Sequence, residues 1–175
     1  MSYTPPVVGG DQTLTTIGSM DMLGAAFAWT TPAAAAYPLA NLALYIPFSV
    51  SQTLTAYEGW VITGTVAGGN FDIGVYSAAG SRLTSSGATA RTASAVVNTT
   101  TMTDLVLLPN TRYYMAFAAD ATSNYMSTTN VAGLNEAMGI LESTTSYVLP
   151  TTPTMSRTTR AYVPQFGLNL YTVAM

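Results

Sequence analysis

The sequence predicts an all-β protein, an antiparallel β-sandwich of the jelly-roll type that carries an extended N-terminal arm. Apolar residues alternate with other residues in short runs separated by turn residues, and helix-forming stretches are nearly absent. Composition agrees, because twenty-nine of the 175 residues are threonine, whose β-branched side chain suits strands. About eight short strands in one body of this length are typical of two packed sheets with about four strands each.

Residues 1–12 are expected to form the arm, and residues 13–175 a single sandwich domain. Two adjacent prolines favour polyproline geometry, and Gly9 and Gly10 make a flexible joint before the body begins. Such a segment is either a frayed terminus or an arm that docks on a neighbouring subunit. In the second interpretation the contact residues are Tyr3, Pro5, Pro6 and Val7.

The first elements of the domain are weakly patterned. Leu14 and Ile17 indicate one short strand, and Phe27 and Trp29 a second. Residues 32–41 contain four consecutive alanines, but prolines near both ends leave room for at most one or two helical turns. We therefore predict a loop there.

Clear strands follow from residue 44 to residue 77. Alternation predicts an inward face made by Leu44, Ile46, Phe48 and Val50, then Trp60 and Ile62, then Phe71, Ile73 and Val75. The intervening residues, including Tyr45, Asp72 and Tyr76, are expected to face outward. The turn signals at Gly68-Gly69 and at Gly80 indicate antiparallel pairing.

The rest of the chain continues the pattern. Residues 84–95 are either a long loop or a flat edge strand, and a turn at Pro109-Asn110 leads into a strand over residues 111–120. Residues 131–142 allow one or two helical turns. A long final strand is predicted, with its inward face made by Tyr162, Pro164, Phe166, Leu168 and Leu170.

The chain has no lysine, no histidine and no cysteine, and only 7% of it is charged, against about 25% in an ordinary soluble domain. Most side chains that act as proton shuttles, nucleophiles or zinc and copper ligands are therefore missing. We expect no catalytic residue, no cofactor and no metal. Five scattered arginines do not make a nucleic-acid-binding face, and no apolar stretch predicts a signal peptide or a membrane span.

Carboxylates are the remaining candidates for chemistry. A glycosidase can act with two of them, but none of the eight acids lies in a recognisable acid-rich motif. The interpretation we favour is structural, with each acid solvated or paired with an arginine. Asp104 and Arg112, which flank a predicted turn, are candidates for such a pair.

Two stretches carry a family resemblance: GWVITGTVAGGNFDIGVYSAAGSRLTSSG (59–87), preceded by LYIPFSV, and LVLLPNTRYYMAFAA (105–119). The hairpin FDIGVYSAAGSRL followed by a PNTRYYMAF strand resembles β-sandwich modules in virion structural proteins of tailed bacteriophages, of the head-decoration or minor-tail type. The resemblance covers residues 42–120. It implies a jelly-roll-like, oligomeric virion protein and no catalytic residues.

Two functions follow as expectations. The first is a capsid decoration (cement) protein that forms a homo-oligomer, a trimer in the favoured form, and binds the major capsid protein or another virion protein. It would reside in the virion after assembly in the host cytoplasm. The second is a tail or fibre module that binds a host glycan or receptor, with Trp29, Tyr76 and Tyr114 as stacking residues. Location on the head or on the tail is left open.

Overall fold

The computed structural model describes residues 13–19, 33–65, 68–91, 95–120, 124–129 and 133–172. The predicted arm over residues 1–12 and the predicted strand at Phe27 and Trp29 lie outside these residues. The elements are β1 (Leu14–Gly18), β2 (Ala33–Ala36), β3 (Leu42–Phe48), β4 (Leu54–Ile62), β5 (Asn70–Ser77), β6 (Arg82–Ser85), β7 (Thr89–Ala90), β8 (Val97–Leu107), β9 (Tyr113–Ala119), β10 (Asn124–Thr129), α2 (Leu134–Ala137), β11 (Leu141–Thr144), β12 (Ser156–Arg157), β13 (Tyr162–Pro164) and β14 (Phe166–Tyr171).

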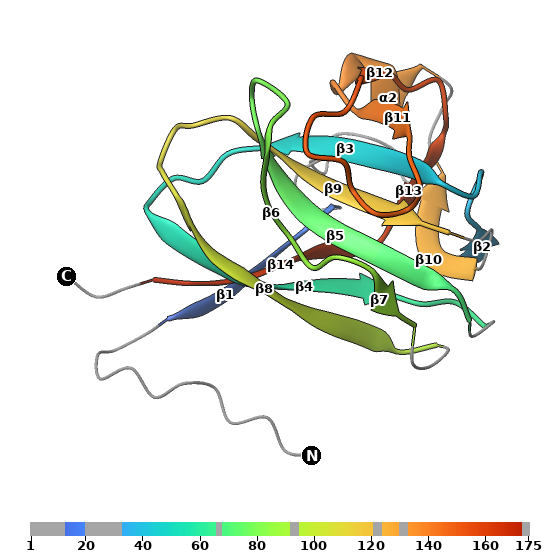
Figure 1. Ribbon diagram of the computed structural model, residues 1–175, viewed down its shortest axis with the longest axis horizontal. Coiled ribbons are helices and arrows are strands. Elements are labelled where there is room, and N and C mark those ends of the chain that lie inside the picture. Colours follow the sequence, from blue (N-terminus) through green and yellow to red (C-terminus); the bar gives the residue numbers. More distant parts are fainter. Residues whose placement is uncertain are drawn as a thin grey trace.

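Eight of these strands form two facing sheets in jelly-roll order (Figure 1). One sheet has the order β1-β14-β4-β8, and the other contains β3-β9-β5-β6. Numbered among the eight, the strands run 1-8-3-6 in the first sheet and 2-7-4-5 in the second, the order of an antiparallel ribbon folded into two Greek keys. The pairs β1–β14, β3–β9, β4–β8 and β5–β6 are all antiparallel. The predicted fold class is confirmed.

The core lies between the two sheets, where the apolar alternation predicted for β3, β5 and β14 is confirmed. The inward residues of β3, β5 and β14 are all buried: Leu44, Ile46, Phe48, Phe71, Ile73, Val75, Phe166, Leu168 and Leu170. At the middle of the sandwich a Cβ on Gly59 of β4 would lie 2.9 Å from the Ile73 side chain of β5. The missing side chain at Gly59 therefore allows Ile73 to pack directly against the β4 backbone.

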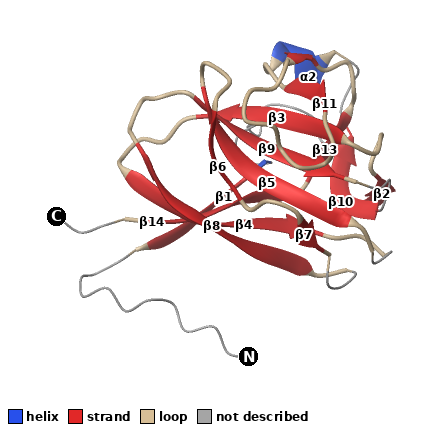
Figure 2. Cartoon of the chain, in the orientation of Figure 1, coloured by secondary structure: helices blue, strands red, loops and turns tan. Residues whose placement is uncertain are grey.

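An insertion between β9 and β14 completes the molecule (Figure 2). Its strand β11 pairs with β3 and extends the second sheet, while β10 and β13 form a three-stranded sheet with β2. The short helix α2 confirms the one helical turn expected there. The loop predicted over residues 32–41 is wrong in part, because Ala33–Ala36 pairs with β10 as β2. Pairing with β10 places these four alanines in a strand, and their helix propensity does not decide the local structure.

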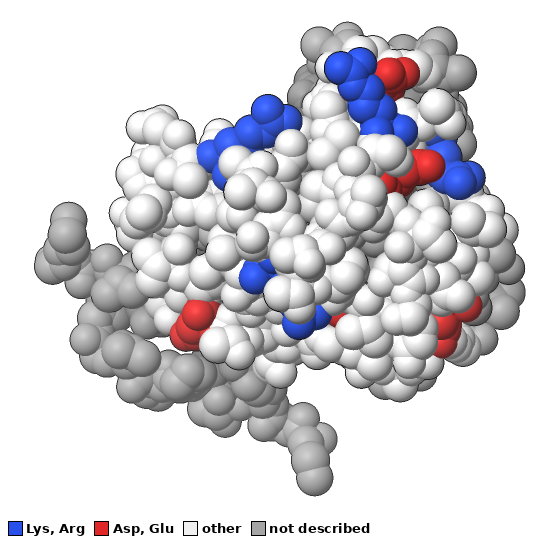
Figure 3. All heavy atoms as spheres, turned by 45° about the horizontal axis from the view of Figure 1, so that its top comes forward, with Lys and Arg blue, Asp and Glu red and all other residues white. Residues whose placement is uncertain are grey.

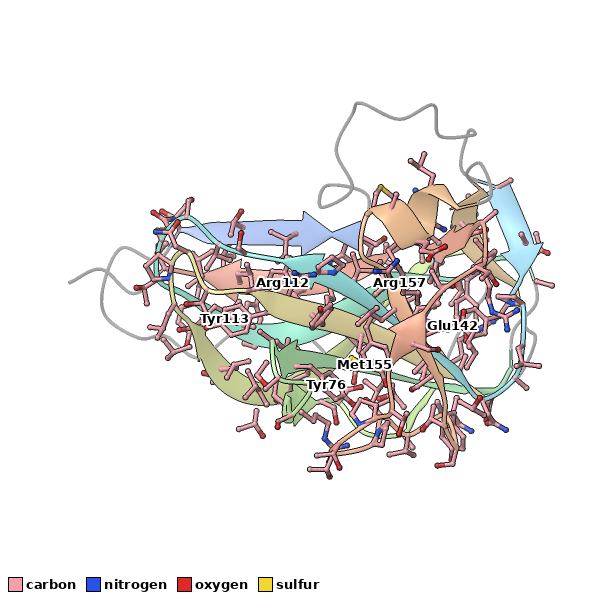
Figure 4. The ribbon with its side chains drawn as sticks, turned by 90° about the horizontal axis from the view of Figure 1, so that it is seen from above. Tyr76, Arg112, Tyr113, Glu142, Met155 and Arg157 are labelled. Carbon is pink, nitrogen blue, oxygen red and sulfur yellow. The ribbon has the colours of Figure 1, made fainter. Side chains whose placement is uncertain are left out.

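The insertion also corrects the expected outward face of β3 and β5. Tyr45, Asp72 and Tyr76 are fully buried, because residues 145–155, here called the strap, lie across that face. Leu149 of the strap packs into an apolar cluster with both tyrosines, and the Tyr76 hydroxyl donates to the Pro150 carbonyl at 2.6 Å. Figure 4 shows Met155 of the strap close to Tyr76. These central strands are thus buried on both faces.

Asp72 fastens the strap to the sheet. Its Oδ2 accepts a hydrogen bond from the Leu149 backbone N–H at 2.8 Å, and its Oδ1 accepts one from the Ser86 hydroxyl at 3.1 Å. Burial raises the pKa of the Asp72 carboxyl, and the hydrogen bonds from Leu149 and Ser86 and the nearby Arg82 offset part of that increase. Neutral donors rather than a contacting cation satisfy this carboxylate.

This raised pKa predicts how the stability depends on pH. A carboxyl whose folded-state pKa exceeds its unfolded value takes up a proton on folding, so its contribution is largest at low pH and is lost as the pH rises through the folded pKa. The free energy of unfolding of the wild type should therefore rise, relative to Asp72→Asn, as the pH falls from 7 toward 4. Urea denaturation at several pH values measures this difference. Asp104→Asn gives the effect of removing one exposed negative charge, and a wild-type advantage that shrinks on acidification would contradict the assignment.

Candidate interaction surface

Two ion pairs lie on the insertion. The ion pairs among the described residues join Arg157 to Glu136 at 3.3 Å and Arg160 to Glu142 at 3.1 Å. Figure 4 shows Arg157 and Glu142 toward one end of the molecule and Arg112 nearer its middle, and Figure 3 shows blue and red atoms over the insertion as well as elsewhere on that face. Most of the formal charge therefore lies away from the first sheet.

The other arginines make local contacts. Arg112 lies over the Tyr114 ring at 5.2 Å, Arg91 lies over the Tyr125 ring at 5.0 Å, and Arg82 donates to the Leu149 carbonyl. The expected pair between Asp104 and Arg112 is not formed, because Asp104 accepts a hydrogen bond from the Tyr171 hydroxyl instead. The two residues flank the turn between β8 and β9, but the Arg112 guanidinium lies over the Tyr114 ring and not beside the Asp104 carboxylate.

The described acids do not assemble into a reactive group. Asp120 accepts hydrogen bonds from the backbone and side chain of Asn70 at 2.8 and 2.6 Å, and Glu58 accepts one from Asn169 at 2.7 Å. Among the described residues no three acids come together as a metal site, and no helix there is long and apolar enough to cross a membrane. The arrangement of these carboxylates is explained by local hydrogen bonding.

The outer face of the β1-β14-β4-β8 sheet contrasts with the insertion. Inward and outward residues alternate along each strand, and we call the outward side the open face. Among the described residues no arginine lies on it, and its two acids there, Glu58 and Asp104, each accept a hydrogen bond from a neutral side chain. Leu14, Val97 and Val106 on this face are 65%, 56% and 55% exposed. The outward side chains are Leu14, Thr16, Tyr57, Glu58, Trp60, Ile62, Val97, Thr99, Thr101, Asp104, Val106, Asn169 and Tyr171.

Aromatic rings lie at both ends of the open face. At one end the rings of Tyr57 and Tyr171 are 5.6 Å apart, and the Tyr171 hydroxyl donates to Asp104 Oδ2 at 2.9 Å. Partial burial and the hydrogen bond to Asp104 raise the pKa of Tyr171. Between the ends, Thr16 donates to Asn169 Oδ1 at 2.9 Å. Across the middle of this face, hydroxyl and amide groups thus accompany one carboxylate, Glu58, which accepts a hydrogen bond from Asn169.

Trp60 covers the other end, which corrects its predicted place in the core. Val61, its neighbour, is the fully buried residue, while Trp60 is half-buried on the outer side. A Cβ on Gly167 of β14 would lie 2.6 Å from Trp60 Cζ2 and 2.1 Å from the Ile17 carbonyl oxygen. The indole thus rests directly on a glycine backbone, and its Nε1 is buried without a hydrogen bond. Alternation alone was ambiguous because both faces of this strand carry apolar residues.

A groove borders the open face along the edge strand β1. Its volume is about 350 Å³, and it runs between β1 and the connection from β3 to β4. Apolar residues form part of the lining, and hydroxyl and amide residues form the rest: Leu14, Ile17, Val50 and Leu54, with Thr13, Thr15, Ser49, Ser51, Gln52 and Thr172. No charged side chain lines it.

The contact and stacking residues proposed from the sequence either lie outside the described residues or are buried. Tyr3, Pro5, Pro6, Val7 and Trp29 lie outside the described residues. Tyr76 is fully buried beneath the strap, and Tyr114 is 8% exposed beneath Arg112, so neither ring offers a face for a sugar to stack on. The half-buried aromatic pair on the open face that sequence reasoning missed is Tyr57 and Tyr171. Alternation with Leu168 and Leu170 is consistent with an outward-facing Tyr171, but nothing local in the sequence places it beside Tyr57.

Comparison with known proteins gives distant structural neighbours alone. No protein-family model matches the sequence, and no curated protein is significantly similar to it. The chain is similar to a solved structure of T=1 particles derived from infectious bursal virus, with 12% identity and a TM-score of 0.34. It is also similar to a mutant VP2 protein of infectious bursal disease virus in derived T=1 particles, with 12% identity and a TM-score of 0.33. In each case 99% of this chain is covered, and the chain spans 44% of the other.

The packing of Trp60 on Gly167 predicts a severe effect of one added methyl group. Gly167→Ala should lower the free energy of unfolding by about 3 kcal/mol or prevent folding, because the new Cβ meets both the indole and the rigid Ile17 carbonyl. Thr99→Ala, an exposed neighbour of Trp60 on the other side, should change it by less than about 0.5 kcal/mol. Urea denaturation measures both, and equal stabilities for the two variants would contradict the described packing.

Proposed function

We propose that this chain is a non-enzymatic structural protein of a virion, a capsid decoration (cement) protein of a tailed bacteriophage that stabilises the head lattice. It acts as a homo-oligomer, with a trimer as the favoured form, and its partner is the major capsid protein or another virion protein. The jelly roll is an architecture shared by viral capsid domains and lectins, so the surface must decide between these uses.

The open face is the observation that carries this proposal. Covering it with another protein would desolvate no arginine and only two carboxylates, both already hydrogen-bonded within the chain. Burying unpaired charge costs far more than burying hydroxyls that keep hydrogen-bond partners. The exposed Leu14, Val97 and Val106 would gain by leaving water. A face of this kind supports protein–protein contact.

Charge placement further supports a passive role. The insertion keeps Arg157 and Arg160 in ion pairs, and Arg112 lies over an aromatic ring. Attraction to nucleic acid requires several cations free to neutralise phosphates on one face, and this arrangement does not favour it. Location in the virion, with no nucleic acid or membrane as partner, is part of the proposal.

The second candidate function is glycan or receptor binding by a tail or fibre module. The pair Tyr57 and Tyr171 favours it, because neighbouring half-buried rings beside a carboxylate and an amide are groups that can stack on and hydrogen-bond a sugar. The stacking residues of this alternative are thus on the open face. Tyr76 and Tyr114 are buried elsewhere.

A charge placed on the open face tests the structural function. Val106→Glu should weaken self-association, or binding to bare phage capsids, by at least about tenfold, because the new carboxylate would be desolvated without a partner. Leu83→Glu is the matched control, since Leu83 is 43% exposed on β6 of the other sheet. Analytical ultracentrifugation and capsid co-sedimentation measure the two affinities. The proposal is contradicted if the wild type stays monomeric and does not bind capsids, or if the two variants change the affinities equally.

Glycan binding is separated by a second measurement. A glycan array probed with the wild type should remain at background if the structural function is right. If the wild type binds a glycan, and Tyr57→Ala and Tyr171→Ala each abolish that binding while Thr99→Ala preserves it, the second candidate replaces the first.

A further inference from the structure

We infer that the groove beside β1 receives the N-terminal segment, residues 1–12, of a second copy of this chain. This inference rests on the proposed function in one respect, namely that the chain associates with itself. The groove has a volume of about 350 Å³, and Thr13, the residue that directly follows the segment, lines it. Each copy therefore carries both the groove and, beginning at its rim, the segment that would fill a neighbour's groove.

β1 is an incomplete edge in the part of the chain that the structure describes. It stands at the end of the order β1-β14-β4-β8, paired with β14 on one side (Figure 1). Leu14 on this strand is 65% exposed. Exposed edge strands are usually blunted by charge or proline or covered by another segment, and β1 carries neither charge nor proline. An extended peptide laid along it would cover both the edge and Leu14.

The chemistry of the segment matches that of the groove. Residues 1–10 contain no charged side chain, and Tyr3, Pro5, Pro6 and Val7 supply apolar surface. The groove lining contains four aliphatic residues and no charge. Docking of residues 1–10 would therefore desolvate no ionised side chain, and the charged residue of the segment, Asp11, stands two positions before Thr13. The two prolines have a fixed φ, which reduces the entropy lost when the segment is held in one conformation.

A second copy fits this groove better than the segment's own chain. To return along its own β1, the segment would turn at Gly9-Gly10, and that register sets Pro6 opposite Thr13 and Pro5 opposite Leu14. Proline has no N–H to donate. In this register neither proline could donate a hydrogen bond to β1 at the positions where strand pairing would begin. A segment from a neighbour is free of that register. Twelve extended residues span up to about 40 Å, enough to reach an adjoining subunit.

The absence of cysteine from the chain allows a clean test by site-directed cross-linking. Val7→Cys and Gln52→Cys are prepared as separate full-length variants, mixed, and treated with a short bismaleimide. We expect the mixed Val7–Gln52 dimer to exceed, by at least about fivefold, the product formed between Val7→Cys and Leu83→Cys, whose thiol lies on the other sheet. A mixed product no greater than this control overturns the inference.

Two further measurements separate the alternatives. The double variant with both cysteines in one chain is cross-linked at a concentration where it is monomeric, and efficient cross-linking within that chain overturns docking on a second copy. Deleting residues 1–12 should weaken self-association at least about tenfold. If the deletion changes nothing while the full chain still associates and binds capsids, the groove inference fails and the proposed function stands. If the full chain neither associates nor binds capsids, both fail.

Discussion

β14 lies between β1 and β4, so the first sheet exists only when the last strand of the chain has been inserted into its middle. β14 fits between its two neighbours because Gly167 leaves room for the Ile17 carbonyl on one side and the Trp60 indole on the other. Pairing between segments roughly 150 residues apart, such as Thr16 with Asn169, is costly in loop entropy and is expected to form late in folding. The open face, the edge strand and the groove all depend on this placement of β14 between β1 and β4.

The two sheets solve the problem of their outer faces differently. The second sheet is covered from within the chain, by a strap that Asp72 and Tyr76 hold through hydrogen bonds to Leu149 and Pro150. The first sheet has no comparable cover among the described residues, and it carries exposed Val97 and Val106. The charges follow the same division, since the ion pairs lie on the insertion beside the second sheet. The outer face of the second sheet is thus covered by its own chain, whereas the first sheet would bury more apolar surface if a neighbouring molecule covered it.

Local alternation was sufficient to predict β5 and its inward residues, because Phe71, Ile73 and Val75 carry a clear period of two. It failed for Asp72 and Tyr76, whose cover comes from a strap more than seventy residues further along the chain. It also failed for Trp60, because a strand with apolar residues on both faces does not reveal which face meets the core. The candidate surface was missed for the same reason. Tyr57 and Tyr171 become a pair only through the register of β14 on β4.

Leu14 belongs to both the open face and the groove, so the two surfaces are not independent. A segment seated in the groove would cover part of this side chain and extend the sheet at its edge, and a partner on the open face would then meet a wider, more rigid surface. Thermodynamic linkage requires the effect to be reciprocal: if docking at the groove strengthens contact at the face, contact at the face strengthens docking at the groove by the same factor. If both contacts form, the second would form within an existing complex at high effective concentration, so the two together would bind more firmly than either alone.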